Sequence, residues 1–595
     1  VERSLYGVDL KPEAVRLCEL RLWLAIVSTT EVGIEQIPPL PNLDRNILQG
    51  NSLLGPADFL GDARAEIYRE WVYALRAQSD LLERYRHSPR EERPALARLI
   101  RENDRRLASD LVARAIDADE AELQLLTAPQ EDLFGRALAA DLERCRELQA
   151  RIAGHRRTLD RIEEGTLDFF SFDVHFAPVM ARGGFDVVAG NPPWVRNARI
   201  DARAKRMVSD RYAFFRPASG GAAFHQPDLS VAFFERALSL AGDGGVVSML
   251  MPAKIMNAAY AAPLRRAAMQ HDVVAIEDWS ASAKRYFDAD TFPLGLTLAK
   301  RRPRGRIHVV DDDLSFEATP ADFGGTCEWS LVPPEAAAIL RRLRAAHRPL
   351  AITLGRRPLM GVKTGDNHAF FLGDCRIRGA ALITEDHLCV PLAHVARCVR
   401  GRDLKRWSAG PTEWMVWPRN GWKTPPRWLR NLAGARGVDV SDFQLAYVKP
   451  EHVGIKVAWK DVSRGMTAAV LSDSVDVNGR AVPLVPNQTL YSIDAVSLDE
   501  AYALSAVLNS TVANALLLAV AERAKDAHFR MFGRTVAQLP LPPLDDATAL
   551  TRLARRAHAG RGVDADIDRA VAELYGVSEK DFAKLRRFVD HRLAR

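Results

Sequence analysis

The sequence predicts a doubly wound α/β fold, and three observations carry that prediction. Residues 185–189 form an apolar run, Phe-Asp-Val-Val-Ala, as expected of a strand buried on both faces of a parallel sheet. Residues 5–9 form a shorter predicted strand that runs directly into a helical pattern. Strand and helix signals then alternate from residue 226 to residue 300. Such alternation indicates a parallel sheet covered by helices.

The amino-terminal strand ends in an acid, Asp9, and the helix after it has Pro12 in its first turn. In dinucleotide-binding folds an acid at this position hydrogen-bonds a ribose hydroxyl, but Asp9 is placed equally well to be the N-cap of the helix. Another short strand, over residues 46–49, leads into a polar turn. Asn51 in that turn could meet the adenine of a nucleotide cofactor or simply make the turn.

A helical insertion is predicted between residues 62 and 165. This segment is rich in Arg, Glu, Leu and Ala, and its apolar residues recur at three- and four-residue spacing with mixed charges between them. The pattern is typical of a helical hairpin or a short antiparallel coil. Its charges favour a solvated face over a DNA-binding surface.

The strand at residues 185–189 runs into Asn191-Pro192-Pro193-Trp194, at the strand end where open α/β sheets bind ligands. An Asn side-chain oxygen and a proline carbonyl can each accept one N–H of an exocyclic amine. Those two bonds aim the amine's lone pair at an electrophilic methyl group. The indole of Trp194 offers a face on which a planar base can stack, although the tetrapeptide alone could also be a turn backed by a core tryptophan.

Further strands are predicted over residues 244–252, 273–279 and 293–300. Between the last two lie Phe287 and Phe292, either of which could supply a second aromatic face opposite Trp194 or belong to the core. Residues 304–348 are basic, contain Pro and Gly, and enclose a helical pattern. They are predicted to be a linker between two domains.

The segment from Arg397 to Arg436 concentrates cations with little counter-charge, which suits contacts to phosphates. Tryptophans interleave with the cations and are predicted to be core residues rather than base-stacking ones. The sequence therefore predicts a DNA-binding domain over residues 349–544, followed by carboxy-terminal helices over residues 545–595. The candidate phosphate-contacting residues are Arg400, Arg402, Lys405, Arg406, Lys423 and Arg427.

The composition places limits on the protein as a whole. The chain has 595 residues, 47% of them hydrophobic, with a formal net charge of +6, which is a mild bias toward polyanionic partners. Its six cysteines are scattered without a C-x-x-C pair, so we expect a reducing, cytoplasmic setting and neither structural zinc nor disulfides. No run approaches the ~18 apolar residues of a membrane span. The start at Val1 lacks an initiator Met and is expected to be a cut edge.

Taken together, these segments resemble the TaqI-type amino-methylating DNA methyltransferases, above all the type IIG restriction-modification methylases and the PglX-like methylases of phage-exclusion systems. The resemblance covers nearly the whole chain. The matching segments are Tyr6–Pro12, Asn46–Leu54, Asn191–Trp194, the strand from Gly244 to Pro252, the Phe287 segment, Gly361–Asn367 and Leu508-Asn509-Ser510.

This resemblance implies a class I (Rossmann-like) methyltransferase sheet, in a first part over residues 1–61 and a catalytic part over residues 166–303, and an α+β carboxy-terminal target-recognition domain. It implies S-adenosylmethionine as the methyl donor, no metal, and a target adenine flipped out of double-stranded DNA and methylated at N6. Asp9 would hold the cofactor ribose and Asn51 would lie beside its adenine, where an acid is commoner. Asn191 and Pro192 would polarise the amine, with Trp194 and Phe287 on either side of the base.

The family's glycine-rich loop, which follows the first strand of the sheet, has no counterpart in this sequence. We therefore expect an upstream segment or a separate subunit to supply it. The sequence contains no recognisable set of nuclease active-site residues, so DNA cleavage is not predicted for this chain. Partner proteins of a restriction or defence system are nevertheless expected. Two alternatives remain open: a truncated, inactive DNA-binding remnant, and an amino-methyltransferase that acts on RNA or on a glutamine of a protein.

Overall fold

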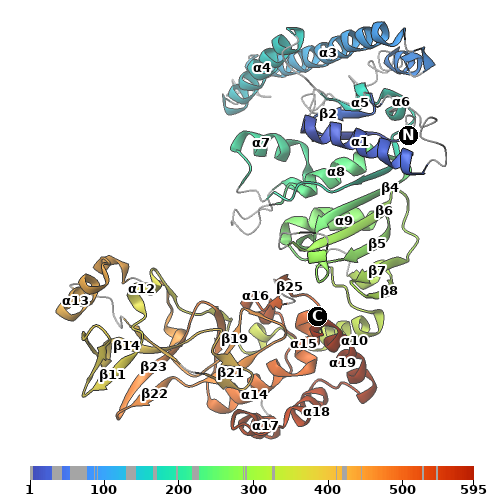
Figure 1. The fold of residues 1–595 in the computed structure, drawn as a ribbon. Helices are drawn as coiled ribbons and strands as arrows, with labels where there is room; N and C mark the ends of the chain where they lie inside the picture. The colour runs from blue at the N-terminus through green and yellow to red at the C-terminus, as the bar shows by residue number, and fades with distance from the viewer. Residues whose placement is uncertain are drawn as a thin grey trace, which may run out of the picture. The chain divides into compact units, whose positions relative to one another are not determined.

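The structure is a computed structural model that divides into two compact units (Figure 1). The first unit comprises Val1–Ile276 and Gly295–Gly305, and the second comprises Glu277–Leu294 and Arg306–Arg595. Both units mix helices with strands, so the predicted α/β class is confirmed at the level of a mixed α/β architecture. The described residues are 4–29, 43, 45–53, 77–85, 87–89, 91–128, 142–164, 170–195, 199–216, 227–285, 287, 291–323, 329–410, 412–417, 425–443, 445–524, 528–544 and 547–594.

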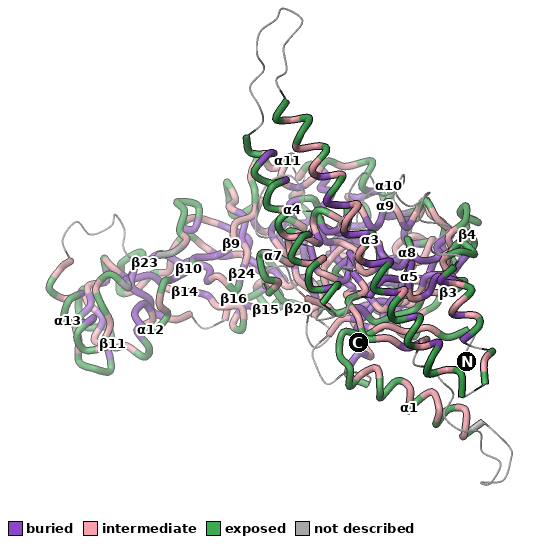
Figure 2. Tube along the Cα trace, turned by 90° about the horizontal axis from the view of Figure 1, so that it is seen from above, coloured by how far each residue is buried: buried purple, intermediate pink, exposed green. Residues whose placement is uncertain are grey.

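The first unit begins with a small parallel sheet. Strand β1 (Gly7–Asp9) pairs with β2 (Ile47–Gln49), and Asp9 lies opposite Gln49. Helix α1 (Pro12–Thr29) follows β1, as the Pro12 signal predicts. None of the described side chains of α1 is buried, although the helix is rich in Leu, Val and Ile. Figure 2 shows α1 entirely in the colours of exposed and intermediate residues.

The predicted helical insertion is present as a hairpin of α3 (Arg93–Thr127) and α4 (Leu142–Glu163). Leu107, Leu111 and Leu148 are buried in the hairpin. Two ion pairs join the helices at solvent-accessible positions: Arg144 to Glu122 at 2.7 Å and Arg156 to Glu120 at 2.6 Å. These two pairs lie on a solvated face, whereas Asp104 and Asp119 of α3 are buried.

The largest sheet has six strands in the order β3-β4-β6-β5-β7-β8. Strand β3 runs parallel to β4, with Gly190 opposite Met249, whereas β7 and β8 are antiparallel, so the sheet is mixed. Strand β3 is the terminal strand of this order and none of its residues is buried, so the prediction of a strand buried on both faces is wrong for the described residues. The bounds are β3 Phe185–Gly190, β4 Ala241–Pro252, β5 Asp272–Asp278, β6 Pro293–Ala299, β7 Ile307–Asp311 and β8 Leu314–Ala318.

The expectation of a linker over residues 304–348 differs from the structure. Strands β7 and β8 extend the sheet there, and the helix expected inside this segment is α10 (Pro334–Ala346). The reason is local alternation, since Ile307, Val309 and Asp311 are buried while His308 between them is exposed. A period of two in a short segment specifies a strand even where the surrounding composition is basic and rich in Pro and Gly.

An aromatic cluster connects β1 and β2 with β3 in the first unit. Two short helices, α5 (Phe172–His175) and α6 (Ala177–Met180), supply part of it. The ring of Tyr6, just before β1, lies 5.7 Å from the ring of Phe185, which opens β3. The amino-terminal ends of these two strands are therefore neighbours. The cluster consists of Phe170, Phe172, Phe176 and Leu240, with Tyr6, Val8, Leu48, Met180, Phe185 and Val188 packed against it.

The second unit contains two four-stranded sheets, ordered β17-β14-β23-β22 and β21-β19-β24-β9. The bounds of the first are β14 Val395–Val399, β17 Glu413–Val416, β22 Ser474–Val477 and β23 Arg480–Pro486; those of the second are β9 Leu359–Met360, β19 Lys456–Lys460, β21 Ala468–Leu471 and β24 Leu490–Asp494. Three smaller strands of this unit are β20 Val462–Ser463, β25 Glu522–Ala524 and β26 His528–Arg530.

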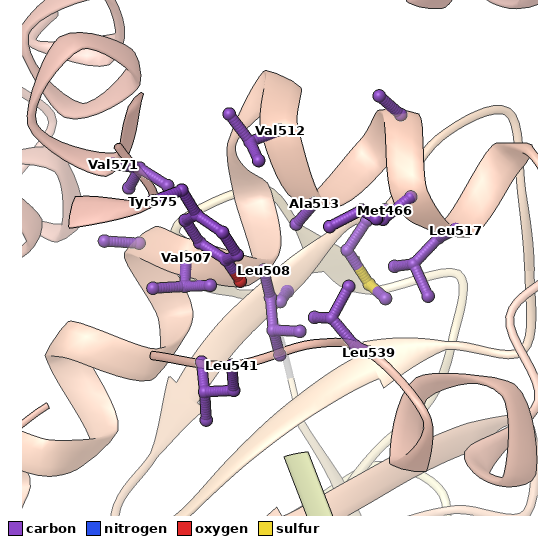
Figure 3. Close-up of a cluster of buried hydrophobic side chains, with 14 of the residues drawn as sticks. Met466, Val507, Leu508, Val512, Ala513, Leu517, Leu539, Leu541, Val571 and Tyr575 are labelled. Atoms are coloured by element: carbon purple, nitrogen blue, oxygen red, sulfur yellow. The ribbon is translucent and has the colours of Figure 1, made fainter. Parts of the chain in front are cut away.

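Helices pack on the second of these sheets around a large apolar core, part of which Figure 3 shows, and most of the buried residues of the first sheet belong to a separate apolar cluster. The central helices α14 and α15 bend by 61° at Ser510, and Val507, Leu508, Val512, Ala513 and Leu517 lie in the large core. Among the described residues no single helix is long and apolar enough to cross a membrane, and α14 with α15 is the one bent pair that meets the length and composition test. The bounds are α14 Leu498–Asn509, α15 Thr511–Leu518, α17 Thr548–His558, α18 Asp564–Leu574 and α19 Glu579–Leu593.

A buried ion cluster holds the strands and helices of the second unit together. Arg523 of β25 donates to Asp278 of β5 at 2.9 Å and to Asp311 of β7 at 2.6 Å. Arg592 of α19 pairs with the same Asp311 at 3.0 Å. The two carboxylates and both guanidinium groups are almost fully buried. The two carboxylates hold the pKa of Arg523 above its ordinary value, against the effect of burial, so this cation stays charged.

Candidate active site and nucleic-acid surface

The loop after β3 is entered through a glycine turn. Gly183 and Gly184 have φ angles of +102° and +119°, and a Cβ on Gly184 would lie 2.5 Å from the carbonyl oxygen of Leu240. Only glycine fits this turn, which sets the direction in which β3 starts. Strand β3 then ends at Gly190, and Asn191-Pro192-Pro193-Trp194 follows at its carboxyl end, as predicted.

Asn191 and Pro193 are exposed, Pro192 is buried and Trp194 is half-buried. The indole Nε1 of Trp194 donates to the carbonyl oxygen of Leu250 at 3.1 Å. This bond fixes the polar edge of the indole on β4 and leaves part of the ring at the surface. A core tryptophan sealed behind a turn, the alternative interpretation of this loop, is therefore not what the structure shows. The amide of Asn191 is open to a ligand.

Asp9 and Asn51 lie next to each other at the carboxyl ends of β1 and β2, because the amide of Gly50 donates to the carbonyl oxygen of Asp9 at 2.9 Å. Both side chains are exposed. Asp9 Oδ1 accepts from the amide of Lys11 at 2.8 Å, and Asn51 Oδ1 accepts from the amide of Leu53 at 3.0 Å. Each residue thus stabilises its own turn, and contact of either with a cofactor stays a prediction.

Helix α8 (Ser230–Leu240) connects the two parts of this site. The amide of Leu229, at its amino end, donates to the carbonyl oxygen of Val195 at 2.9 Å, directly after the Asn191 loop. Arg236 of the same helix donates from Nε to the carbonyl oxygen of Ser52 at 3.2 Å, beside Asn51. One helix therefore positions both loops. Nothing in the sequence pattern of residues 226–240 singled out Arg236.

Phe287 is half-buried, and its amide donates to the carbonyl oxygen of Ala283 at 2.9 Å. It belongs to the second unit, whereas Trp194 belongs to the first. The aromatic pair on either side of a base therefore stays a prediction.

The predicted phosphate-contacting cations do not form one free surface. Arg400 pairs with Glu413 at 2.5 Å, and its guanidinium lies 4.0 Å from the centre of the Phe371 ring. Arg406 pairs with Asp564 at 3.0 Å and donates to the carbonyl oxygen of Asn509 at 2.9 Å. These two arginines thus have structural partners, which lowers their value as DNA-contact candidates.

The remaining candidates are more open. Arg402 contacts Glu413 and Asp403, but its side chain is 66% exposed. Lys405 and Arg427 are exposed, and Lys423 lies outside the described residues. The prediction that the interleaved tryptophans are core residues is confirmed for the three that are buried, Trp407, Trp414 and Trp417.

Known restriction-modification methylases are similar to this chain in sequence. Residues 3–283 match the family model described as Eco57I restriction-modification methylase. The Type II methyltransferase M.PaeR7I of Pseudomonas aeruginosa is 25% identical over 456 residues, which covers 69% of this chain and 74% of that protein. The Type II methyltransferase M.XhoI of Xanthomonas vasicola is 22% identical over 444 residues, which covers 67% of this chain and 76% of that protein.

Among solved structures, the type IIL restriction-modification enzyme MmeI in complex with DNA is similar over 89% of this chain and 77% of its own, with 12% sequence identity and a TM-score of 0.45. The type IIG restriction endonuclease BpuSI covers 91% of this chain and 76% of its own, with 12% identity and a TM-score of 0.28.

Proposed function

We propose that the chain is a site-specific DNA methyltransferase, and the premise is the match of residues 3–283 to the Eco57I restriction-modification methylase model. In this proposal it transfers a methyl group from S-adenosylmethionine to the exocyclic N6 amine of an adenine flipped out of double-stranded DNA. Its biological setting would be a restriction-modification or phage-defence system. The observation that carries the proposal is the loop after β3, in which Asn191 is exposed and Trp194 is anchored by its indole nitrogen.

Asn191 and Pro192 would act on the amine through hydrogen bonds. Asn191 Oδ1 and the carbonyl oxygen of Pro192 each accept one N–H, so the lone pair of the nitrogen is drawn out of conjugation with the ring and toward the methyl donor. The two prolines restrict the backbone that presents the carbonyl oxygen. Stacking of the base on the half-exposed indole of Trp194 contributes about 1–3 kcal/mol and offsets part of the few kcal/mol that flipping costs.

The residues at the carboxyl ends of β1 and β2 fit a nucleoside cofactor. Asp9 is an exposed carboxylate beside a second exposed polar side chain, Asn51, and one oxygen of Asp9 is already fixed by its turn. Asp9 would accept hydrogen bonds from ribose hydroxyls, and Asn51 would lie beside the adenine. S-adenosylmethionine supplies an electrophilic methyl group when bound.

One further strand would complete the cofactor site. Strand β3 ends the six-strand order, and its Val187 is 61% exposed, while β1 and β2 form a separate pair. Nucleotide-binding α/β sheets carry their glycine-rich loop on the strand between those two positions. We propose that an upstream segment or a subunit adds this strand, parallel to β1 and β3.

The test is methyl transfer with labelled S-adenosylmethionine and unmethylated genomic DNA, followed by digestion to nucleosides. The chain is assayed alone and together with the residues encoded upstream of Val1. We expect label in N6-methyladenine, and we expect Asn191→Ala to lower transfer at least about 100-fold while DNA binding persists. Arg182→Ala, at an exposed position before the glycine turn, is the control that keeps full activity.

Equal activity of Asn191→Ala and the parent would remove the proposed role of the loop. Label in RNA or in a protein glutamine would keep the chemistry but change the substrate. DNA binding without cofactor binding, even with the upstream residues present, would indicate an inactive remnant.

A further inference from the structure

The second unit contains a groove that is lined in part by Arg402, one of the predicted phosphate-contacting residues. Three chain segments line it: the turn after β14, the junction between β19 and β20, and the turn between β23 and β24. Its volume is ≈ 480 Å³. The polar side chains that line the groove include Arg402, Lys460, Asp461 and Gln488.

Hydrogen bonds tie the three segments to one another. The amide of Gly401 donates to Thr489 Oγ1 at 2.9 Å, and the amide of Asp461 donates to the carbonyl oxygen of Thr489 at 3.1 Å. The amide of Asn487 donates to the carbonyl oxygen of Val399 at 2.9 Å. The groove is therefore held by backbone bonds from strand ends, which are rigid supports.

The Gly361 segment supports the turn that carries Gln488. The amide of Val362 donates to the carbonyl oxygen of Pro486 at 2.8 Å, and the amide of Gln488 donates to the carbonyl oxygen of Val362 at 3.0 Å. A Cβ on Gly361 would lie 2.2 Å from the carbonyl oxygen of Asn487, so only glycine permits this approach. The segment that begins at Gly361 therefore supports the turn that carries Gln488.

Asp461 is an acid among the residues that line the groove. Its Oδ2 pairs with Arg530 at 3.2 Å, but its Oδ1 is buried and has no hydrogen-bond partner among the described residues. Burial raises the pKa of this carboxyl above its ordinary value, because the charged form loses water. Because Oδ1 is buried and Oδ2 pairs with Arg530, Asp461 lines the groove but offers no open acceptor to a ligand.

We propose that this groove reads the edge of a DNA base. In it, the amide of Gln488 bonds to the edge of a base, while Lys460 and Arg402 contact the flanking phosphates. The inference rests on the proposed function, since it assumes a double-stranded DNA substrate. Amides pair with the N6 and N7 atoms of adenine, whereas contacts of lysine and arginine to phosphate carry no sequence information.

The two roles predict different effects for two substitutions. Lys460→Ala should weaken binding to every duplex by a similar factor, about 10-fold, and reduce the slope of log affinity against log salt by about one. Gln488→Ala should instead relax the preference at a single base pair, by about 10- to 100-fold in the discrimination between preferred and changed duplexes. Arg480→Ala, at an exposed position at the opposite end of β23, is the matched control and should change neither quantity.

The measurement is fluorescence anisotropy with a pool of duplexes at several salt concentrations, together with sequencing of the sites that the chain methylates. Thermal unfolding of each variant must match that of the parent. If the unmodified chain discriminates between duplexes, and Lys460→Ala and Gln488→Ala discriminate as well as it does, the groove inference is wrong and the proposed function stands. If the parent binds no duplex at all, both are wrong. A uniform loss in Gln488→Ala with unchanged preference would also overturn the base-reading role.

Discussion

Helix α1 and the bent pair α14–α15 are both rich in apolar residues, yet they end in opposite surroundings. Leu17, Leu20 and Leu24 of α1 are 49%, 48% and 49% exposed. In contrast, Leu508 and Val512 of the bent pair have no exposed surface, and Figure 3 shows them inside the core of the second unit. Large apolar patches that stay exposed mark surfaces where another segment binds. The difference is one between these elements: the bend between α14 and α15 is covered by the core of its unit, whereas Leu17, Leu20 and Leu24 of α1 stay exposed.

The largest expected effect concerns the buried ion cluster of the second unit. Arg523→Ala removes the cation that faces Asp278 and Asp311, both almost fully buried. Because the carboxylates would remain buried with less counter-charge, we expect the free energy of unfolding to fall by about 3–5 kcal/mol. Urea unfolding followed by circular dichroism measures this change. Arg534→Ala removes an exposed ion pair with Glu522, at 2.7 Å, and should cost less than about 1 kcal/mol.

A matched pair of leucine truncations tests the comparison directly. Leu508→Ala, at a fully buried position of α14, should lower the free energy of unfolding by about 2–5 kcal/mol, through lost burial and a cavity. Leu20→Ala, at a half-exposed position of α1, should lower it by less than about 1 kcal/mol. Equal costs in the same urea experiment would mean that α1 is as well covered as α14.

A third change tests whether the apolar face of α1 is exposed to solvent. The triple variant Leu17→Glu, Leu20→Glu and Leu24→Glu places charges on half-exposed positions, so stability should change by less than about 1 kcal/mol. The variant should self-associate no more than the parent chain does at the same concentration, because the apolar face is lost. Sedimentation velocity over a range of concentrations measures it. Unfolding of the triple variant would show instead that this face is already packed.

The smallest effect concerns cysteine reactivity in the folded protein. Cys18 on α1 is exposed, whereas Cys398 in the second unit is buried, and burial raises the pKa of its thiol to about 12. Burial and the nearby carboxylates of Glu19 and Asp9 also hold the pKa of Cys18 above its ordinary value. Because the thiolate is the reactive form, alkylation of Cys18 should be slow at pH 7 and should accelerate as the pH rises toward 9 and beyond.

Mass spectrometry of peptides after brief iodoacetamide treatment distinguishes the two thiols. Cys398 should stay unmodified at every pH at which the protein is folded. Modification of both cysteines at one rate would contradict the contrast between the two regions.

The sequence predicted those parts of the molecule whose signals are local. The strand that ends at Gly190, the turn residue Asn51 and the helical hairpin all follow from patterns within a few consecutive residues. Strands β7 and β8 were the exception. The Pro and Gly residues around them led to the prediction of a linker, although a short alternation of buried and exposed residues specifies a strand there.

Long-range pairing could not be predicted in the same way. Arg406 stood in a basic stretch, but its partner Asp564 is 158 positions away along the chain. The groove likewise depends on Arg402, Lys460 and Gln488 meeting from three separate segments. Composition counts such cations as available for phosphate, and only the folded arrangement shows which of them already have a carboxylate.

The ion cluster of the second unit also limits how the protein can be divided for experiments. Asp278 and Asp311 lie in the strands β5 and β7, while the guanidinium groups that neutralise them come from residues 523 and 592. A truncation that keeps those strands but ends before residue 523 would leave two carboxyls in an apolar interior. Such a fragment should be recovered in inclusion bodies, and a soluble methylase half would require Asp278→Asn and Asp311→Asn together.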